Sequence, residues 1–286
     1  MKPVRATLIF VGQLLKIRLA GLGLAIVVGF LILAAGAELI APYDPYYQDY
    51  QSVLQGPSLA HLMGTDDMGR DVLSRIIHGS RISLQVGLVS VGLAMVGGII
   101  LGLASGYCSG WLDELLMRLV DAVWSFPALL LALAITAALG QSIGNAMIAI
   151  GVVYMPAFAR LVRAQTLSIR ERDFVLAARL LGATPSRLMV KHIWPNVTAP
   201  VIVQASLYVS FAIITEASLS FLGVGVSLPT PAWGSMLRVG YRYLETALWL
   251  PFFPGLAIFL TVLGLNLLGD GLRIVWDPRL RAKGKG

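Results

Sequence analysis

The sequence predicts an all-α, polytopic membrane protein with about six transmembrane helices. Of its 286 residues, 57% are hydrophobic and only 13% are charged, whereas soluble domains carry roughly 25% charged residues. The mean hydropathy is +0.79, and one crossing of a bilayer needs about 20 apolar residues. The length therefore accommodates about six helices with short connections, which leaves little room for a separate soluble enzyme.

The first predicted span is Leu19–Ile40, and only basic charges precede it, at Lys2, Arg5, Lys16 and Arg18. This basic flank predicts a cytoplasmic N-terminus. A cleaved signal peptide is the alternative, because Ala35-Gly36-Ala37 resembles a processing site. We favour an uncleaved helix, since the apolar run is longer than a usual signal core and further spans follow.

Pro42 ends that helix, and the polar segment Tyr43–Ser80 is predicted to be an external loop. Near its end, apolar residues recur at helical spacing after Asp71: Val72, Leu73, Ile76 and Ile77. This spacing predicts a short amphipathic helix that lies on the membrane surface.

The remaining spans are predicted over Leu84–Ala104, Leu115–Leu139, Ala146–Val162, Ala199–Leu222 and Leu250–Leu268. In the first of these, Gly98, Gly102 and Gly106 form a smooth strip that lets another helix approach closely. Pro127 is expected to kink the next span. A loop rich in glycine and proline, Gly223–Glu245, is predicted to be external, and the basic residues after Leu268 predict a cytoplasmic C-terminus.

The net charge of +7 comes from lysine and arginine residues that flank the apolar runs, as membrane-orientation signals do. No basic stripe is interleaved with aromatic residues, so the pattern disfavours nucleic-acid binding. The single cysteine, Cys108, excludes an internal disulfide and a multi-cysteine metal cluster. We expect it to pack as a small apolar residue.

The stretch Ser168–Asn196 is too polar to span a membrane, yet it is patterned as two short helices. Counting crossings from the N-terminus places it in the cytoplasm, and its excess of arginine and lysine agrees. The first helix is expected to end at Gly182, which suits a left-handed cap. Thr184 and Pro185 then fit the N-cap and first position of the second helix, and Pro195 closes the unit. The alternatives are a surface for a partner protein and an inert interfacial hairpin.

At these residues the chain resembles the membrane permeases of binding-protein-dependent ABC importers. Their cytoplasmic signature is a Glu-Ala-Ala-x-x-x-Gly pattern followed by Ile-x-Leu-Pro. The matching positions here are Ala177, Ala178, Gly182 and Pro195, with the expected spacing. Leu176 stands at the glutamate position, and His192 and Trp194 replace the isoleucine and leucine, so no role of the signature's glutamate carries over.

Further motifs extend the resemblance to the branch that handles dipeptides, oligopeptides and nickel. They are His61-Leu62-Met63-Gly64-Thr65-Asp66, Gly69-Arg70-Asp71 with Ser74-Arg75, Met117-Arg118 with Asp121 and Ser125-Phe126-Pro127, Ser218-Leu219-Ser220-Phe221-Leu222-Gly223, and Asn266 to Asp270 with Asp277-Pro278. These motifs cover the chain almost end to end. The acidic first external loop is similar to that of the second of the two permease types that this branch pairs.

The resemblance implies a type I ABC importer permease fold, with an N-terminal region 1–80, a transmembrane domain 81–270 and a basic tail 271–286. It implies a bacterial inner-membrane location, both termini cytoplasmic, and three kinds of partner: a second permease subunit, two ATPase subunits and a periplasmic substrate-binding protein. ATP and Mg²⁺ would be bound by the ATPases, since this chain has no G-x-x-x-x-G-K-[ST] loop, and no cofactor, metal or catalytic residue is assigned here. The implied ATPase-coupling residues are Ala177, Ala178, Gly182, Ala183, Pro185 and Pro195.

A small peptide is the expected substrate, with nickel and glutathione as alternatives within the same architecture. Glu216 and Asn266 are candidates to line the pathway, because polar groups within spans usually face a cavity or the bundle interior. For Glu216 the alternative is an interfacial position, and for Asn266 a hydrogen bond between helices.

A secondary transporter and an intramembrane hydrolase are the two alternatives to an ABC importer permease. A secondary transporter would run on an ion gradient without an ATPase. An intramembrane hydrolase would use Ser142, which lies in a G-x-S-x-G sequence, but no histidine or acid nearby completes a triad. His61 and His78 do not form a nickel ligand set, and solvated histidines are the preferred interpretation.

Overall fold

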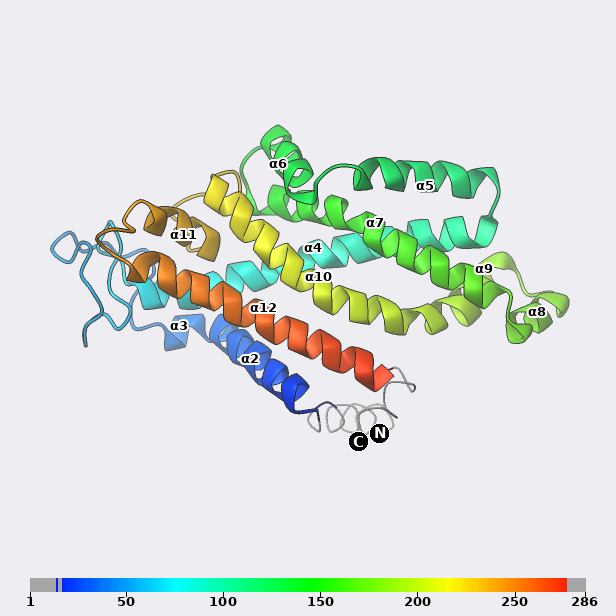
Figure 1. Cartoon of the computed structure of the whole chain (residues 1–286), viewed down its shortest axis with the longest axis horizontal. Helices are drawn as coiled ribbons and strands as arrows, with labels where there is room; N and C mark the ends of the chain where they lie inside the picture. Colours follow the sequence, from blue (N-terminus) through cyan, green and yellow to red (C-terminus); the bar gives the residue numbers. More distant parts are fainter. Residues whose placement is uncertain (1–13, 15–16, 277–286) are drawn as a thin grey trace.

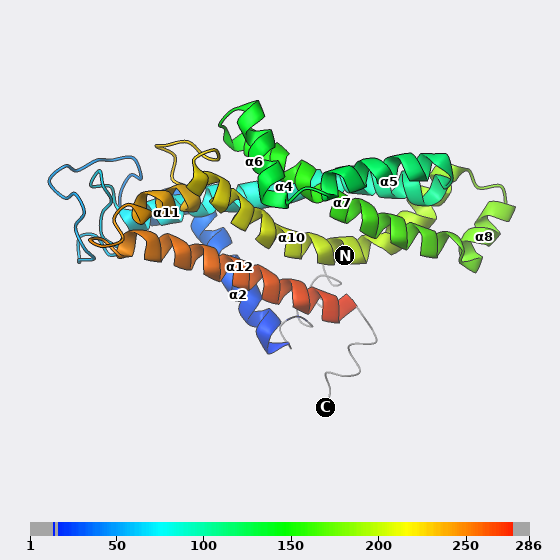
Figure 2. The same ribbon diagram turned by 45° about the horizontal axis from the view of Figure 1, so that its top comes forward.

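The computed structural model describes residue 14 and residues 17–276, and it is an elongated bundle of helices (Figure 1). The helices are α2 (Arg18–Ala35), α3 (Ala37–Ile40), α4 (Val72–Cys108), α5 (Trp111–Trp124), α6 (Ala128–Leu139), α7 (Ile143–Arg170), α8 (Asp173–Leu180), α9 (Pro185–Arg187), the π-helix η1 (Leu188–Ile193), α10 (Trp194–Leu222), α11 (Trp233–Tyr241) and α12 (Trp249–Trp276). The segment 41–71 and α11 lie at one end of the bundle, and α8 lies at the other (Figures 1 and 2).

Five of the described helices are long and apolar enough to cross a membrane, and a sixth span results if α5 and α6 count as one. This agrees with the predicted number of spans. α5 and α6 meet at a bend of 91°, and Pro127 stands at the bend as the N-cap residue of α6. The predicted proline kink is therefore a full break, because proline lacks the N–H that would continue the helix.

The predicted surface helix near Val72 is wrong, because these residues are the first turns of α4. Asp71 caps this helix by accepting a 2.8 Å hydrogen bond from the backbone N–H of Ser74. Val72, Ile76 and Ile77 are buried, and the indole of Trp233 in α11 donates a 3.0 Å hydrogen bond to the carbonyl of Ile76. No proline interrupts α4, so the helix runs from the external segment into the membrane without a break.

α4 and α7 pack closely along the predicted glycine strip. A Cβ on Gly102 would lie 2.6 Å from both the carbonyl oxygen of Ala159 and the Cβ of Val162. A Cβ on Gly106 would lie 2.7 Å from the Cβ of Thr166. The strip thus brings two helix backbones together, as small residues do in lipid.

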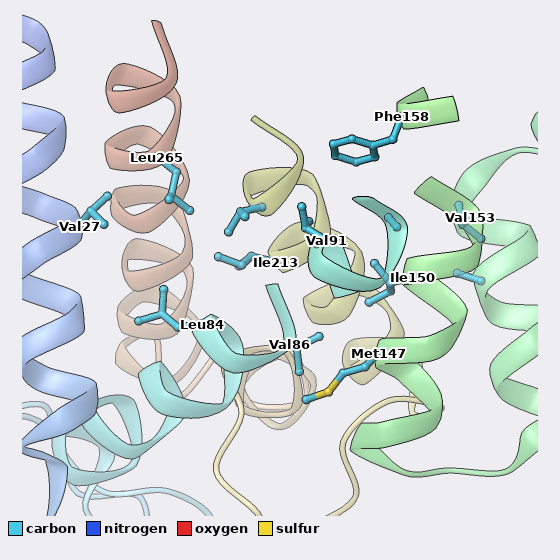
Figure 3. Close-up of a cluster of buried hydrophobic side chains, with 14 of the residues drawn as sticks. Val27, Leu84, Val86, Val91, Met147, Ile150, Val153, Phe158, Ile213 and Leu265 are labelled. Atoms are coloured by element: carbon cyan, nitrogen blue, oxygen red, sulfur yellow. The ribbon is translucent and has the colours of Figure 1, made fainter. Parts of the chain in front are cut away.

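The buried core joins α2, α4, α7, α10 and α12. Figure 3 shows Val27 of α2 pointing toward Leu265 of α12, and Met147 of α7 pointing toward Val86 of α4. Cys108, by contrast, is exposed at the end of α4, so its expected packing in the core is wrong. The turn that begins at Ser109 carries it away from the packed interior.

Candidate functional site

The candidate site is the α8–η1 hairpin, residues 171–193, at the end of the bundle opposite segment 41–71 (Figure 1). The predicted short helix that ends before Gly182 is confirmed as α8, and a second helix follows the turn. α8 ends in two capping bonds, from Gly182 N to Arg179 O at 3.0 Å and from Ala183 N to Ala178 O at 3.1 Å. This pair of hydrogen bonds requires a residue with a left-handed backbone conformation after the helix. Gly182 supplies it, with φ +82°.

The second helix begins as predicted, with Thr184 as the N-cap residue and Pro185 in the first turn. Thr184 has the extended backbone of an N-cap, but its side chain makes no capping hydrogen bond. The fixed φ of proline and the position of an already unpaired N–H therefore account for the start of this helix.

The prediction that Pro195 closes the unit is wrong. Pro185–Leu222 is one helical stretch, and Pro195 lies in the first turn of α10. A proline ring normally clashes with the carbonyl four residues earlier, here that of Lys191, which lies within η1. The wider π-helical turn gives the ring room and lets the helix continue.

One face of the hairpin is anchored in the bundle. Val175, Leu188 and Ile193 are fully buried and belong to the main core. Ala178 and Ala183 are half-buried and pack against the same core. The hairpin is therefore packed against the bundle along this face.

The other face exposes apolar side chains beside basic ones. Leu180 is 88% exposed and Leu181 is 89% exposed, directly before Gly182. Phe174 and Val190 are also exposed, and exposed cationic side chains lie among them: Arg172, Arg179, Arg187 and Lys191. Contiguous exposed apolar groups with a polar rim are typical of protein interaction sites.

The predicted coupling residues divide into two places. Ala177, Ala178, Gly182, Ala183 and Pro185 lie together around the turn. Pro195 lies beyond η1 and is separated from that turn. Leu180 and Leu181, the most exposed apolar residues of the hairpin, were not among the predicted coupling residues. Helical spacing alone does not show which side of α8 faces the core. In the structure the buried residue of α8 is Val175.

Ion pairs and backbone contacts connect the end of α7, which precedes the hairpin, to the turn between α4 and α5. Arg170, the last residue of α7, donates a 3.0 Å hydrogen bond to the carbonyl of Gly106 in α4. About two helical turns further back, Arg163 forms two 2.6 Å hydrogen bonds with Asp113 in α5, and Ser105 also donates to Asp113. These contacts join the end of α7 to the turn between α4 and α5.

The two pathway candidates occupy different environments. Glu216 is fully buried, accepting a 2.7 Å hydrogen bond from Ser220 and a 3.4 Å bond from Ser83 of α4. It therefore lies inside the bundle of this single chain. Asn266 is half-buried on α12.

Other motif residues have structural partners. Ser142 is the N-cap of α7 and accepts a 3.0 Å hydrogen bond from the N–H of Asn145. His61 lies 2.9 Å from the carboxylate of Asp71 and packs on the ring of Tyr43. His78 Nδ1 lies 2.9 Å from the carbonyl of Ser74. The histidines are therefore engaged in the fold, and their expected solvation is wrong.

The chain is similar to known transport proteins. Residues 98–282 match the model of the binding-protein-dependent transport system inner membrane component, and residues 9–57 match the N-terminal transmembrane domain of oligopeptide transport permease C. A dipeptide transport system permease of Alkalihalophilus pseudofirmus is 45% identical over 94% of this chain and 89% of its own length. A glutathione transport system permease of Pectobacterium atrosepticum is 44% identical over 87% of this chain and 83% of its own.

A solved structure supports the fold. The inward-facing methionine ABC transporter MetNI contains a chain that matches with a TM-score of 0.57 and 18% identity, over 71% of this chain and 97% of that chain. The two chains share their overall fold.

Proposed function

The chain belongs to the family of binding-protein-dependent transport system inner membrane components, and on that premise we propose that it conducts small peptides in an ABC importer whose separate ATPase subunits grip the α8–η1 hairpin. The observation that carries the coupling proposal is the pair of almost fully exposed leucines, Leu180 and Leu181. They project from a helix end that is rigidly capped and anchored in the core.

A small peptide is the substrate that the relatives favour. Relatives above 40% identity, each aligned over most of its own length, are named for dipeptides, for di- and tripeptides and for glutathione. Glutathione is itself a short peptide, so one kind of pathway suits all of these substrates.

Exposed apolar area at the hairpin tip supports docking. Burying a leucine side chain in a partner contributes roughly 1.5–3 kcal/mol, and such anchors usually dominate an interface. The surrounding arginines and Lys191 favour a partner groove with an acidic rim, since complementary charges steer association. The partner would bind ATP and Mg²⁺, and this chain would contribute no cofactor site of its own.

Transmission would proceed from the hairpin to the spans through contacts already described. η1 continues into α10, and Arg170 and Arg163 tie α7 to the turn between α4 and α5. An ATPase that closes on ATP would bind the hairpin differently in its two states. Only such a difference in affinity can shift the permease between outward-facing and inward-facing conformations.

The full assembly that we propose has this chain, a second permease, two ATPases and an external binding protein. It lies in the bacterial inner membrane, with the hairpin and both termini of this chain in the cytoplasm. The excess of basic residues in the hairpin supports this orientation.

Reconstitution in proteoliposomes tests the proposal. We expect uptake of a labelled dipeptide only when the second permease, the ATPases, the loaded binding protein and ATP are all present. A catalytically dead ATPase is the matched control. Uptake by this chain alone on an ion gradient would contradict the proposal and indicate a secondary transporter.

A further inference from the structure

A cavity of about 890 Å³ opens between α7, α10 and α12, and the coupling proposal uses one of its lining residues, Arg172, only as a charge beside the docking surface. Its walls combine apolar side chains, including Leu161, Val203 and Leu207, with two glutamines and two arginines. The volume lies within the range of roughly 300–1,000 Å³ that is usual for small-molecule sites.

The glutamines lie on membrane-spanning helices. Gln165 belongs to α7 and Gln204 to α10, and both side chains are half-buried. Gln204 donates from Nε2 to the carbonyl of Ala157 at 3.1 Å, which leaves its carbonyl oxygen and its second N–H for a ligand. Polar groups within spans face protein or water because contact with lipid is costly. The cavity is therefore a water-accessible groove.

The arginines are Arg172, which precedes α8, and Arg273 in the last turn of α12. Within the part of the chain that the structure describes, neither side chain forms an ion pair, in contrast to Arg163 and Arg170 nearby. Two guanidinium groups without acidic partners at one cavity are suited to bind a carboxylate, which they can hold with paired N–H donors.

We propose that this groove binds the peptide on the cytoplasmic half of its route, with Gln165 and Gln204 pairing with peptide amides and Arg172 and Arg273 holding the α-carboxylate. This inference rests on the proposed function, and it names the residues of this chain that recognise the substrate class. Every peptide has a main-chain amide and most have a free carboxylate. The apolar walls then accept different side chains without requiring any one of them.

Cysteine accessibility in the complete importer tests the groove. In a Cys108→Ser background, Val203→Cys lines the cavity, whereas Ile202→Cys replaces the exposed neighbour outside it. Inside-out vesicles are treated with a charged, membrane-impermeant thiol reagent, and the intact mass of this chain reports its labelling. We expect Val203→Cys to react about tenfold faster than Ile202→Cys, because lipid excludes a charged reagent.

Protection by the ligand supplies the second readout. A dipeptide should slow labelling of Val203→Cys, and a C-terminally amidated dipeptide should need about tenfold more concentration for the same effect, since it lacks the charged partner of the arginines. Arg273→Gln should remove that difference, whereas Arg81→Gln, at the other end of the bundle, should retain it.

The outcomes separate this inference from the proposed function. Equal labelling rates of the two cysteines would contradict the proposal that the groove is a peptide site, even if the importer takes up dipeptide. Equal protection by the free and the amidated dipeptide would contradict it as well. A wild-type importer that takes up no dipeptide would contradict the proposed function itself. Loss of protection by the free acid in Arg273→Gln, with labelling of Val203→Cys retained, supports the inference.

Discussion

The guanidinium of Arg163 donates two hydrogen bonds, each 2.6 Å long, to the carboxylate of Asp113. This pair joins α7 to the start of α5, beside the turn that also receives Arg170. It is the shortest described connection from the end of α7 to the broken span formed by α5 and α6. It links α7, after which the hairpin follows in the chain, to the pair formed by α5 and α6.

Replacing Arg163 should therefore reduce peptide uptake more strongly than it reduces the stability of the permease. Arg163→Gln should lower the free energy of unfolding by about 1–2 kcal/mol, because the pair is only partly buried. Peptide uptake should fall while ATPase association is retained. Arg160→Gln is the control, since its partner Asp121 is 60% exposed. Equal losses of uptake in both variants would contradict a specific role of Arg163.

Gly182→Ala should weaken coupling through backbone strain alone. Its φ of +82° is unfavourable for alanine by about 1–2 kcal/mol, yet the added Cβ would have no atom within 4 Å. Gly140→Ala is a matched control with φ +92° and equally open space, in the turn between α6 and α7. Both should lower the melting temperature similarly, and only Gly182→Ala should lower uptake. Normal uptake in both variants would show that the backbone geometry at Gly182 is not needed for transport.

Close packing of α4 on α7 gives a stability prediction. Gly102→Ala should cost about 1–3 kcal/mol, because the new Cβ meets backbone and Val162. Gly92→Ala on the same helix meets nothing within 4 Å and should be neutral or stabilise by up to about 1 kcal/mol. Thermal unfolding in detergent measures both. A tolerated Gly102→Ala would show that the helices separate more easily than the contacts indicate.

The external segment predicts opposite pH effects at two carboxyl groups. Partial burial and the nearby Asp66 raise the pKa of Asp67, and one of its oxygens has no hydrogen bond. The hydrogen bond from Ser52 lowers the pKa of Asp49. The ionised form is thus disfavoured by folding at Asp67 and favoured at Asp49.

The signs follow from proton binding. Stability from Asp67 is present below the unfolded pKa of about 4 and is lost as pH rises through the raised folded pKa. Asp67→Asn should therefore raise the melting temperature at neutral pH. Stability from Asp49 is lost as pH falls below about 4, so Asp49→Asn should lower the melting temperature at neutral pH. A change of the melting temperature in the same direction for both substitutions would contradict these pKa assignments.

Much of the fold follows from hydrophobic runs and from the bias of basic residues. The positions of the spans could be predicted because a run of about 20 apolar residues is what one crossing of a bilayer needs. The turn could be predicted because Gly182 and Pro185 each suit a specific backbone position at the end and start of a helix. The continuous start of α4 could not be predicted, because its first turns are amphipathic and are buried by other parts of the chain, among them Trp233 of α11.

The site was predictable in its position but not in its exposed face. Apolar spacing indicates that residues 173–180 are helical, but tertiary packing decides that Val175 faces the core and Leu181 does not. The π-helix η1 also left no periodic signal. It is visible only as the way in which the chain accommodates Pro195 without ending a helix.

Docking at the tip of the hairpin is tested most directly by the affinity of the purified ATPase for the purified permease pair. Leu181→Ser changes a side chain that is 89% exposed, and Leu59→Ser, in the external segment, changes one that is 99% exposed. Both variants should keep the wild-type melting temperature. We predict that Leu181→Ser weakens ATPase binding by about tenfold or more, as loss of an interface anchor does, whereas Leu59→Ser leaves it unchanged. Wild-type affinity in Leu181→Ser would contradict the account.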